Sequence, residues 1–134
     1  MPDSAESIRV PGLFQRGDFT LHSGEKSGIK IDCDALTDAD LDTIAWMLRD
    51  RLPLFGRVEG VPTGGLKLAA LMERYARPAQ SGLLIVDDVL TSGGSMEEQR
   101  AGRDAFGAVI FARRKPPSWV MPLFMVAPLL IDGG

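Results

Sequence analysis

The sequence has little cysteine and no surplus of positive charge. Cys33 is the one cysteine among 134 residues, so no disulfide can form within the chain. Lys and Arg number 15 against 18 Asp and Glu, which gives a formal net charge of −3. Because nucleic-acid recognition normally begins with a basic face, this balance argues against a nucleic-acid partner. Any anionic ligand must therefore be held locally.

Long apolar runs and targeting segments are also lacking. The most apolar stretch, residues 119–131, is short and interrupted by Pro122 and Pro128, so we do not expect it to cross a membrane. We expect it to pack on the domain or against a second subunit. The first residues, MPDSAESIRV, have neither the basic region nor the apolar run of a secretion signal. Together with the lone cysteine, this favours a cytoplasmic location.

Repeats and two well-known phosphate-binding strings are missing as well. The chain has no G-x-x-x-x-G-K-[ST] string and no G-x-G-x-x-G string. With 134 residues, 45% of them hydrophobic and 25% charged, it can bury one sizeable core but not two. We therefore expect one domain over residues 13–134, preceded by a loose leader at residues 1–12.

Hydrophobic patterns predict a strand pair followed by alternating strands and helices. Residues 19–21 and 29–32 are short β-prone runs around a glycine-containing turn. Thr37 is suited to cap an amphipathic helix that ends before Pro53. The further expected elements are strands at 57–61, 83–86 and 108–112 and helices at 66–75 and 94–106. Near-continuous apolar strands between helices indicate the α/β class, with a parallel sheet covered by helices on both faces.

Residues 83–100, LLIVDDVLTSGGSMEEQR, place two acids and a run of small and hydroxyl residues directly after an apolar strand. Asp87 and Asp88 then stand at the carboxyl edge of the sheet, where ligands of such folds bind. A sugar hydroxyl that donates to a charged carboxylate makes a bond worth roughly 1.5–3 kcal/mol. The next residues can bring backbone N–H groups and hydroxyls to one phosphate. These residues are Thr91, Ser92, Gly93, Gly94 and Ser95. The pattern favours a sugar phosphate site over an ordinary turn with a capped helix.

The string IVDDVLTSGGS at residues 85–95 resembles the phosphoribosyl pyrophosphate (PRPP) binding motif of type I phosphoribosyltransferases. RGDFTLHSGEKS at residues 16–27 is similar to the G-x-F-x-L-x-S-G-x-x-S region of orotate phosphoribosyltransferases. GVPTGG at residues 60–65 stands where the family has its pyrophosphate loop. The likeness covers about residues 13–115 and implies a minimal version of the type I phosphoribosyltransferase fold.

Residue by residue, the resemblance implies a set of roles. Asp87 and Asp88 would act in catalysis, bind the ribose 2′- and 3′-hydroxyls and hold Mg²⁺, and residues 91–95 would hold the 5′-phosphate. The residues implied for pyrophosphate are Val61, Pro62, Thr63, Gly64, Gly65 and Lys67. Those implied for the base are His22, Lys30 and Arg113.

The resemblance implies transfer of a 5-phosphoribosyl group from PRPP to a nitrogenous base, with release of pyrophosphate, by a magnesium-dependent homodimer without nucleic-acid or membrane partners. The alternative is a catalytically degenerate module that binds PRPP or a nucleotide 5′-monophosphate. A phosphoacceptor receiver domain is a third interpretation, but the order of its acids along the chain differs.

The chain departs from the family pattern at three places. Only residues 77–82 connect the expected helix at 66–75 to the next strand, where the family inserts a strand pair and a mobile, lysine-bearing lid. Without a lid that excludes water, catalysis should be weaker or should need a second subunit. Gly64 replaces a basic residue of the pyrophosphate loop, and His22 and Lys30-Ile31 replace the lysine and the aromatic pair of the orotate enzymes. The base therefore stays open, as does the choice between ligand contact and plain solvation for His22 and Lys30.

Overall fold

The computed structural model describes residues 12–131, so the expected leader lies outside the described residues apart from Gly12. The elements in chain order are β1 (Phe14–Thr20), β2 (Lys26–Ile31), η1 (Cys33–Ala35), α2 (Asp38–Arg49), β3 (Arg57–Gly60), α3 (Leu66–Met72), η2 (Glu73–Tyr75), β4 (Leu83–Leu90), α4 (Gly94–Arg100), β5 (Phe106–Ala112) and β6 (Val120–Met125).

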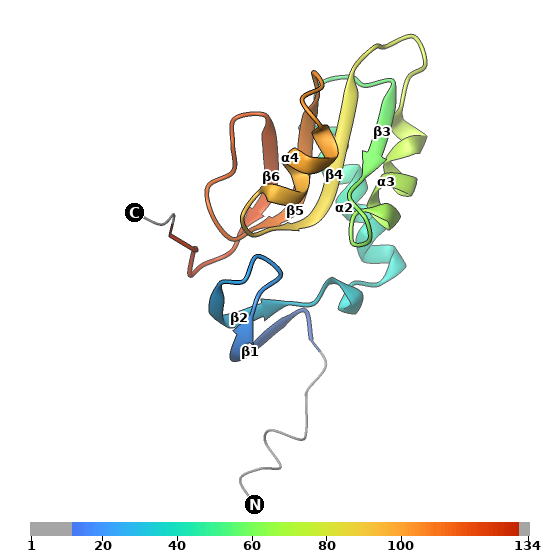
Figure 1. Ribbon diagram of the computed structural model, residues 1–134. Coiled ribbons are helices and arrows are strands. Elements are labelled where there is room, and N and C mark those ends of the chain that lie inside the picture. Colours follow the sequence, from blue (N-terminus) through green and yellow to red (C-terminus); the bar gives the residue numbers. More distant parts are fainter. Residues whose placement is uncertain (1–11, 132–134) are drawn as a thin grey trace, which may run out of the picture.

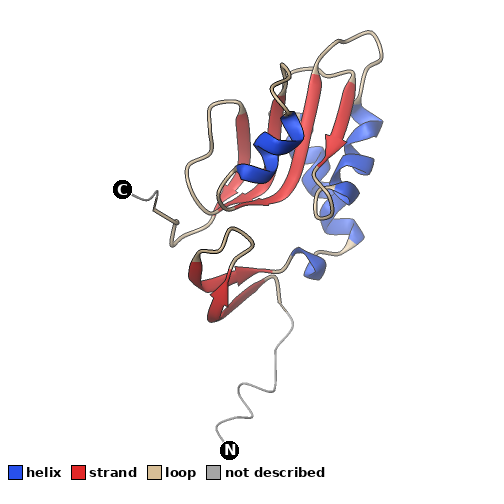
Figure 2. Ribbon diagram, viewed as in Figure 1, coloured by secondary structure: helices blue, strands red, loops and turns tan. Residues whose placement is uncertain are grey.

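The strands form two sheets (Figure 2). β1 and β2 make an antiparallel pair, whereas the other strands form a parallel sheet in the order β3-β4-β5-β6. In Figure 1, α2 and α3 lie on one face of this sheet and α4 lies on the other. The expected α/β class, with a parallel sheet between two layers of helices, is confirmed.

β4 is the central strand on which both layers depend. The side chains of its first five residues are all buried. Leu84 and Val86 pack among residues of α2 and α3, whereas Ile85 packs with Met96 of α4. Because successive side chains of a strand point to opposite faces, a continuously apolar strand needs cover on both faces.

The expected helix after Thr37 forms as α2, and its start is fixed by a capping box. The Thr37 hydroxyl accepts a hydrogen bond from the Asp40 N–H at 3.0 Å, and the Asp40 carboxylate accepts one from the Thr37 N–H at 3.0 Å. The residues that it buries are Leu41, Ile44, Ala45 and Leu48. The chain turns from α2 into β3 through a segment that contains Pro53.

The β1–β2 hairpin lies below the parallel sheet in Figure 1, at the edge where the parallel strands end. The ring of Phe14 meets the ring of Phe111 edge to face, with the ring centroids 5.7 Å apart. A two-stranded hairpin is marginally stable alone, so it depends on such contacts with the larger sheet. The hairpin therefore forms one wall over the carboxyl ends of β4 and β5.

Several elements differ in their bounds from the sequence-based expectation, and β1 begins at Phe14 instead of residue 19. α4 ends at Arg100 instead of continuing to Phe106, because Ala101 and Gly102 adopt left-handed backbone conformations with φ of +54° and +75°. β4 does not end at Val86 but continues through both acids to Leu90. Residues 120–125, expected only as a packing segment, form the edge strand β6 parallel to β5. An edge strand tolerates Pro122 because one side of its backbone needs no hydrogen bonds.

A methyl group at Gly56 should destabilise the fold. A Cβ atom there would lie 1.8 Å from the carbonyl oxygen of Gln80, in the connection that leads to β4. Since backbone must move to make room, we expect Gly56→Ala to lower the free energy of unfolding by about 1–3 kcal/mol. Urea denaturation measures the change. Gly28→Ala is the control, because its Cβ would meet its nearest neighbour, the Gly17 carbonyl oxygen, at an ordinary 3.8 Å; equal losses in both variants would contradict the prediction.

Candidate active site

Asp87 and Asp88 lie in the last part of β4, where the strand leaves the core. Asp87 is buried and Asp88 is half-buried. The Asp88 N–H donates to the Asp87 carboxylate at 2.8 Å, and the Val89 N–H donates to the Asp88 carboxylate at 2.7 Å. Each acid is thus held by the amide that follows it. No ion pair found among residues 12–131 includes either acid.

Two negative charges on Asp87 and Asp88 at the same time are energetically unfavourable. Burial, followed by the hydrogen bond and the charge of Asp88, raises the pKa of Asp87 to about 8. Two close carboxylates without a cation disfavour ionisation of both. Groups that donate hydrogen bonds, or a cation, would relieve this cost. The acid pair is therefore suited to sugar hydroxyls or to a divalent ion.

A cavity of about 550 Å³ lies beside the acids. Its walls come from the hairpin, the loop after β3, the end of β4 and the loop before α4. The lining residues are Phe19, Thr20, Leu21, His22, Lys30, Ile31, Val61, Pro62, Thr63, Gly64, Asp87, Asp88, Val89, Thr91, Ser95 and Arg113. Most of the residues singled out in the sequence thus surround one space, although they come from distant parts of the chain.

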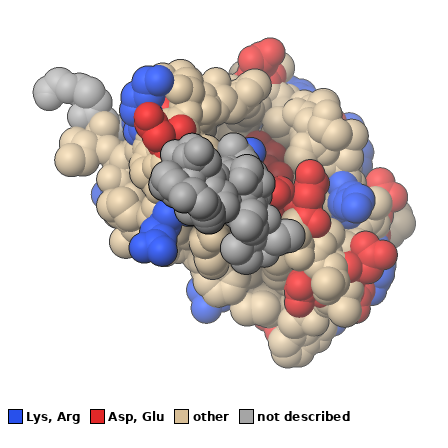
Figure 3. Space-filling view, turned by 90° about the horizontal axis from the view of Figure 1, so that it is seen from below, with Lys and Arg blue, Asp and Glu red and all other residues tan. Residues whose placement is uncertain are grey.

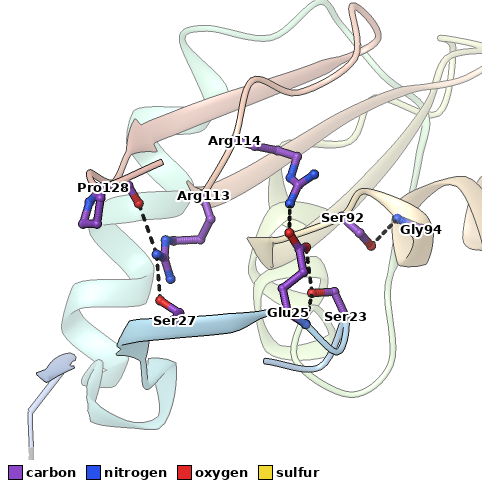
Figure 4. A network of polar contacts seen from close by, with 8 residues as sticks. All are labelled: Ser23, Glu25, Ser27, Ser92, Gly94, Arg113, Arg114 and Pro128. Carbon is purple, nitrogen blue, oxygen red and sulfur yellow. Dashed lines mark hydrogen bonds and ion pairs between the residues drawn. The ribbon is translucent and has the colours of Figure 1, made fainter. Parts of the chain in front are cut away.

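The loop expected to hold a phosphate reaches this cavity with some of its residues. Thr91 and Ser95 line the large cavity, and Ser92 and Gly93 line a small adjoining one together with His22. Gly93 has φ of +87°, a conformation that favours glycine. Gly94 lines neither space, and its N–H donates to the Ser92 hydroxyl at 3.2 Å (Figure 4).

The loop after β3 packs directly against the second acid. A Cβ atom at Gly64 would lie 2.4 Å from a carboxylate oxygen of Asp88. The absence of a side chain at this position therefore lets the loop approach the acid. Gly65 is buried, and Lys67 lines a neighbouring cavity of about 370 Å³ that shares Thr63, Gly64 and Asp88 with the main one. Of the residues implied for pyrophosphate, these two lie outside the main cavity.

Arg113 has a structural role that the sequence did not reveal. It is 1% exposed, and its guanidinium donates to the Ser27 hydroxyl at 3.1 Å and to the Pro128 carbonyl at 3.2 Å (Figure 4). It also donates to the Ile29 carbonyl at 3.2 Å. Burial lowers its pKa, which the charge of Glu25 partly offsets. Its Nε atom is buried without a hydrogen-bond partner. Arg113 therefore joins the hairpin to the end of β5 as well as lining the cavity.

The neighbouring Arg114 strengthens the same junction. Its guanidinium pairs with the Glu25 carboxylate, which also accepts a hydrogen bond from the Ser23 hydroxyl (Figure 4). Two consecutive arginines at the end of β5 thus contact the turn and the second strand of the hairpin. The anion that Arg114 contacts is thus a side chain of the protein itself.

Several cavity residues were missed by sequence reasoning. Phe19 and Leu21 were given no role in a site, although the alternation of a strand pair predicts that some of its side chains face a ligand. Ile31 was considered only as a replacement for an aromatic residue, and it also lines the cavity. Cys33 lines the smaller cavity beside Asp88. Burial and the nearby acids, Asp88 first among them, raise the pKa of its thiol far above the ordinary value. This thiol is therefore a poor nucleophile.

No group of three or more His, Cys, Asp or Glu side chains that could hold a metal occurs among the described residues. Within the same residues, no helix is long and apolar enough to cross a membrane. Figure 3 views the molecule from the hairpin side, and on this face Lys and Arg do not gather into one continuous patch.

The arrangement of elements defines the class of protein. The orotate phosphoribosyltransferase of Aeropyrum pernix superposes with a TM-score of 0.67 at 23% identity, covering 84% of this chain and 88% of that one. The UMP synthase of Leishmania donovani superposes with a TM-score of 0.66 at 20% identity, covering 85% of this chain and 34% of that one. The chain has the fold of type I phosphoribosyltransferases.

Sequence comparison finds relatives with higher identity than these two structures. An orotate phosphoribosyltransferase of Aeropyrum pernix is 30% identical over 120 residues, and one of Methanospirillum hungatei is 36% identical over 116. Both alignments cover 69% of this chain and 64% of the relative, so the chain spans less than two thirds of these curated relatives. No family model matches. The chain is homologous to phosphoribosyltransferases, and by distant sequence similarity and by fold it resembles orotate phosphoribosyltransferases.

The raised pKa of Asp87 should make the free energy of unfolding fall with increasing pH. The unfolded chain releases this proton near 3.8 and the folded chain near 8. Between these two pH values the folded state binds more protons than the unfolded state. The contribution of Asp87 to the free energy of unfolding is therefore fully present at low pH and is lost as the pH rises through 8. One titrating group can change the free energy of unfolding by at most about 1.4 kcal/mol per pH unit.

Urea denaturation of the wild type and of Asp87→Asn at pH 6 and pH 9 measures this effect. Asparagine cannot ionise, so the variant should lose less stability than the wild type when the pH is raised. The same loss in both proteins would show that Asp87 is already ionised at pH 6.

Proposed function

We propose that this chain binds PRPP or a nucleotide 5′-monophosphate in the large cavity and transfers the 5-phosphoribosyl group to a nitrogenous base, with release of pyrophosphate. One observation carries the proposal. The acid pair, the loop before α4, the loop after β3 and the hairpin surround a single cavity of about 550 Å³ in a chain homologous to phosphoribosyltransferases. Such enzymes need all four parts around one substrate.

Each part has a proposed role. Asp87 and Asp88 accept hydrogen bonds from the ribose 2′- and 3′-hydroxyls. Thr91 and Ser95, with the backbone at Gly93, hold the 5′-phosphate. The residues proposed for pyrophosphate are Val61, Pro62, Thr63 and Gly64, with Gly65 supporting the loop and Lys67 approaching from the neighbouring cavity. The residues proposed for the base are His22, Lys30 and the Nε atom of Arg113.

Type I phosphoribosyltransferases typically use Mg²⁺. The residues here fit that ion, because Mg²⁺ prefers one or two carboxylates together with substrate phosphates over a cage of protein ligands. Asp87 and Asp88 would hold it, and the ion would neutralise charge on the departing pyrophosphate. A cation beside Asp87 would also release the proton that burial favours on this acid.

The proposed reaction forms one bond and breaks one. A ring nitrogen of the base bonds to ribose C1, the bond from C1 to the pyrophosphate oxygen breaks, and pyrophosphate leaves with the electron pair. A proton carried by the attacking nitrogen passes to solvent. Positive charge develops at the ribose in the transition state, where the nearby negative acids stabilise it.

A second candidate function, binding without turnover, is favoured by one observation. The connection at residues 77–82 lies at the amino end of the sheet, where the Arg77 N–H donates to the Phe55 carbonyl at 2.8 Å. This is the edge opposite to the cavity, so the connection cannot close over a substrate. Catalysis in an open site would be slower because water competes with the base.

The base, the location and the assembly belong to the proposal as well. Lys30 and Ile31 offer the base no aromatic pair, so orotate is one candidate among nitrogenous bases. We propose a cytoplasmic homodimer that acts in nucleotide synthesis or salvage.

The enzyme proposal is tested by release of pyrophosphate from PRPP and Mg²⁺ in the presence of a panel of purines, pyrimidines and pyridine carboxylates. We expect one class of base to stimulate release, and we expect the Asp87→Asn/Asp88→Asn variant to lose at least a hundredfold of that rate. If no base raises release above this variant while ribose 5-phosphate still binds in calorimetry, the chain is a binding module.

A side chain at Gly93 should weaken phosphate binding. A Cβ atom there points into open space beside the cavity, and the φ of +87° strains any other residue. We expect Gly93→Val to lower the affinity for ribose 5-phosphate at least tenfold in calorimetry.

Gly102→Val is the matched control for that experiment. Gly102 has φ of +75° and also points into open space, but it follows α4 and lines neither cavity. It should cost similar stability and leave the affinity unchanged. Equal affinity in Gly93→Val and in the control would refute the placement of the phosphate.

A further inference from the structure

β3 leaves one edge of the parallel sheet open. The strand order β3-β4-β5-β6 puts β3 at the end of the sheet, with no strand of residues 12–131 beyond it. A groove of about 430 Å³ runs along this strand. Its lining residues are Gly56, Arg57, Val58, Glu59, Glu73 and Ala76. Residues of the strand itself therefore line the groove.

The hydrogen-bond pattern tells which backbone groups face the groove. The Arg57 N–H donates to the Gly82 carbonyl at 3.2 Å, and the Val61 N–H donates to the Val86 carbonyl at 2.9 Å. In a strand, residues alternate in the side to which their N–H and C=O point. Arg57 and Val61 thus face β4, whereas the N–H and C=O of Val58 point outward. This pair can bond to another strand.

Two opposite charges flank Val58 on one face of the sheet. Glu59 accepts hydrogen bonds from Arg103 at 2.7 and 2.8 Å and from Gln99 at 3.0 Å, which fixes its side chain on the α4 face. Arg57, two residues away, lies on the same face. Its side chain is exposed, and none of the ion pairs among the described residues includes it.

We propose that β3 of a second copy of this chain occupies the groove, antiparallel to the first, with the two-fold axis at Val58. The two Val58 residues then exchange both N–H to C=O hydrogen bonds. Arg57 of each copy lies opposite Glu59 of the other on the same face. The two four-stranded sheets become one continuous sheet across the dimer.

Charge complementarity selects a second copy over an unrelated strand. Charged residues on a short edge strand normally deter other strands. When two copies of Arg57-Val58-Glu59 pair antiparallel, Arg57 of each copy lies opposite Glu59 of the other. The charges that would deter an unrelated strand therefore form two attractive cross-strand pairs. The symmetric pairing also stops at two copies. Pairing of β3 with the other edge strand, β6, would instead leave an edge open on each copy and continue into an open chain of subunits.

The interface is small, so the dimer should form and dissociate with concentration. Sedimentation equilibrium of the full chain from low to high micromolar concentration measures its dissociation constant. We expect Arg57→Glu, which places like charges opposite each other at two positions, to raise this constant at least tenfold. Arg57→Lys retains the charge and should change it less than threefold.

Arg16→Glu makes the same change of net charge on an exposed residue of β1 and should also leave the constant within threefold. Amide hydrogen exchange supplies an independent readout, because exchange at Val58 should slow as the wild type is concentrated and should not slow in Arg57→Glu.

A chain that stays monomeric over this range overturns the proposal, and so does a dimer that Arg57→Glu leaves intact. Affinity for ribose 5-phosphate, measured on the same variants, should not change, since β3 pairs on the side away from the cavity. The dimer and the proposed transferase activity can thus fail separately.

Discussion

Burial of the Asp87 carboxylate beside Asp88 is the constraint around which the site is organised. An isolated buried charge is costly, and here the costly group comes directly after the four buried apolar residues that begin β4. Burial raises the pKa of this acid, so the site is most stable when a proton, a hydroxyl donor or a cation occupies it. The proposed sugar and metal contacts would offset the cost of the buried negative charge. Without them, a bound proton removes that charge.

Two glycines shape the loops around the acids, one through close approach and the other through its backbone conformation. Gly64 lets the loop after β3 lie against Asp88, and Gly93 turns the chain into α4 with a positive φ. Larger residues would either displace the acid or strain the turn. The site thus depends on a close main-chain approach at one loop and on a positive φ at the other, and only a few side chains complete it.

The sequence predicted those parts of the fold that have a local cause. The apolar run before Asp87 predicts a buried strand, and Thr37 with Asp40 predicts the start of α2. β6 was not recognised as a strand, because Pro122 argues against one unless the strand is known to lie at an edge. Much of the candidate site was predictable because its residues follow strands that end at one edge. The three backbone and hydroxyl partners of Arg113 could not be predicted, since they lie far from it in sequence and are brought together only by the packing of the hairpin and the C-terminal segment.

Arg113 also imposes an order on how the chain can assemble during synthesis. Its guanidinium contacts Ser27 and Ile29 of the hairpin and Pro128 near the other end of the described chain. β1 and β2 are translated before these contacts can form, because Arg113 follows β5 and Pro128 follows β6. One wall of the cavity is therefore made before the other walls, and its link to the end of β5 forms only after those walls have been made.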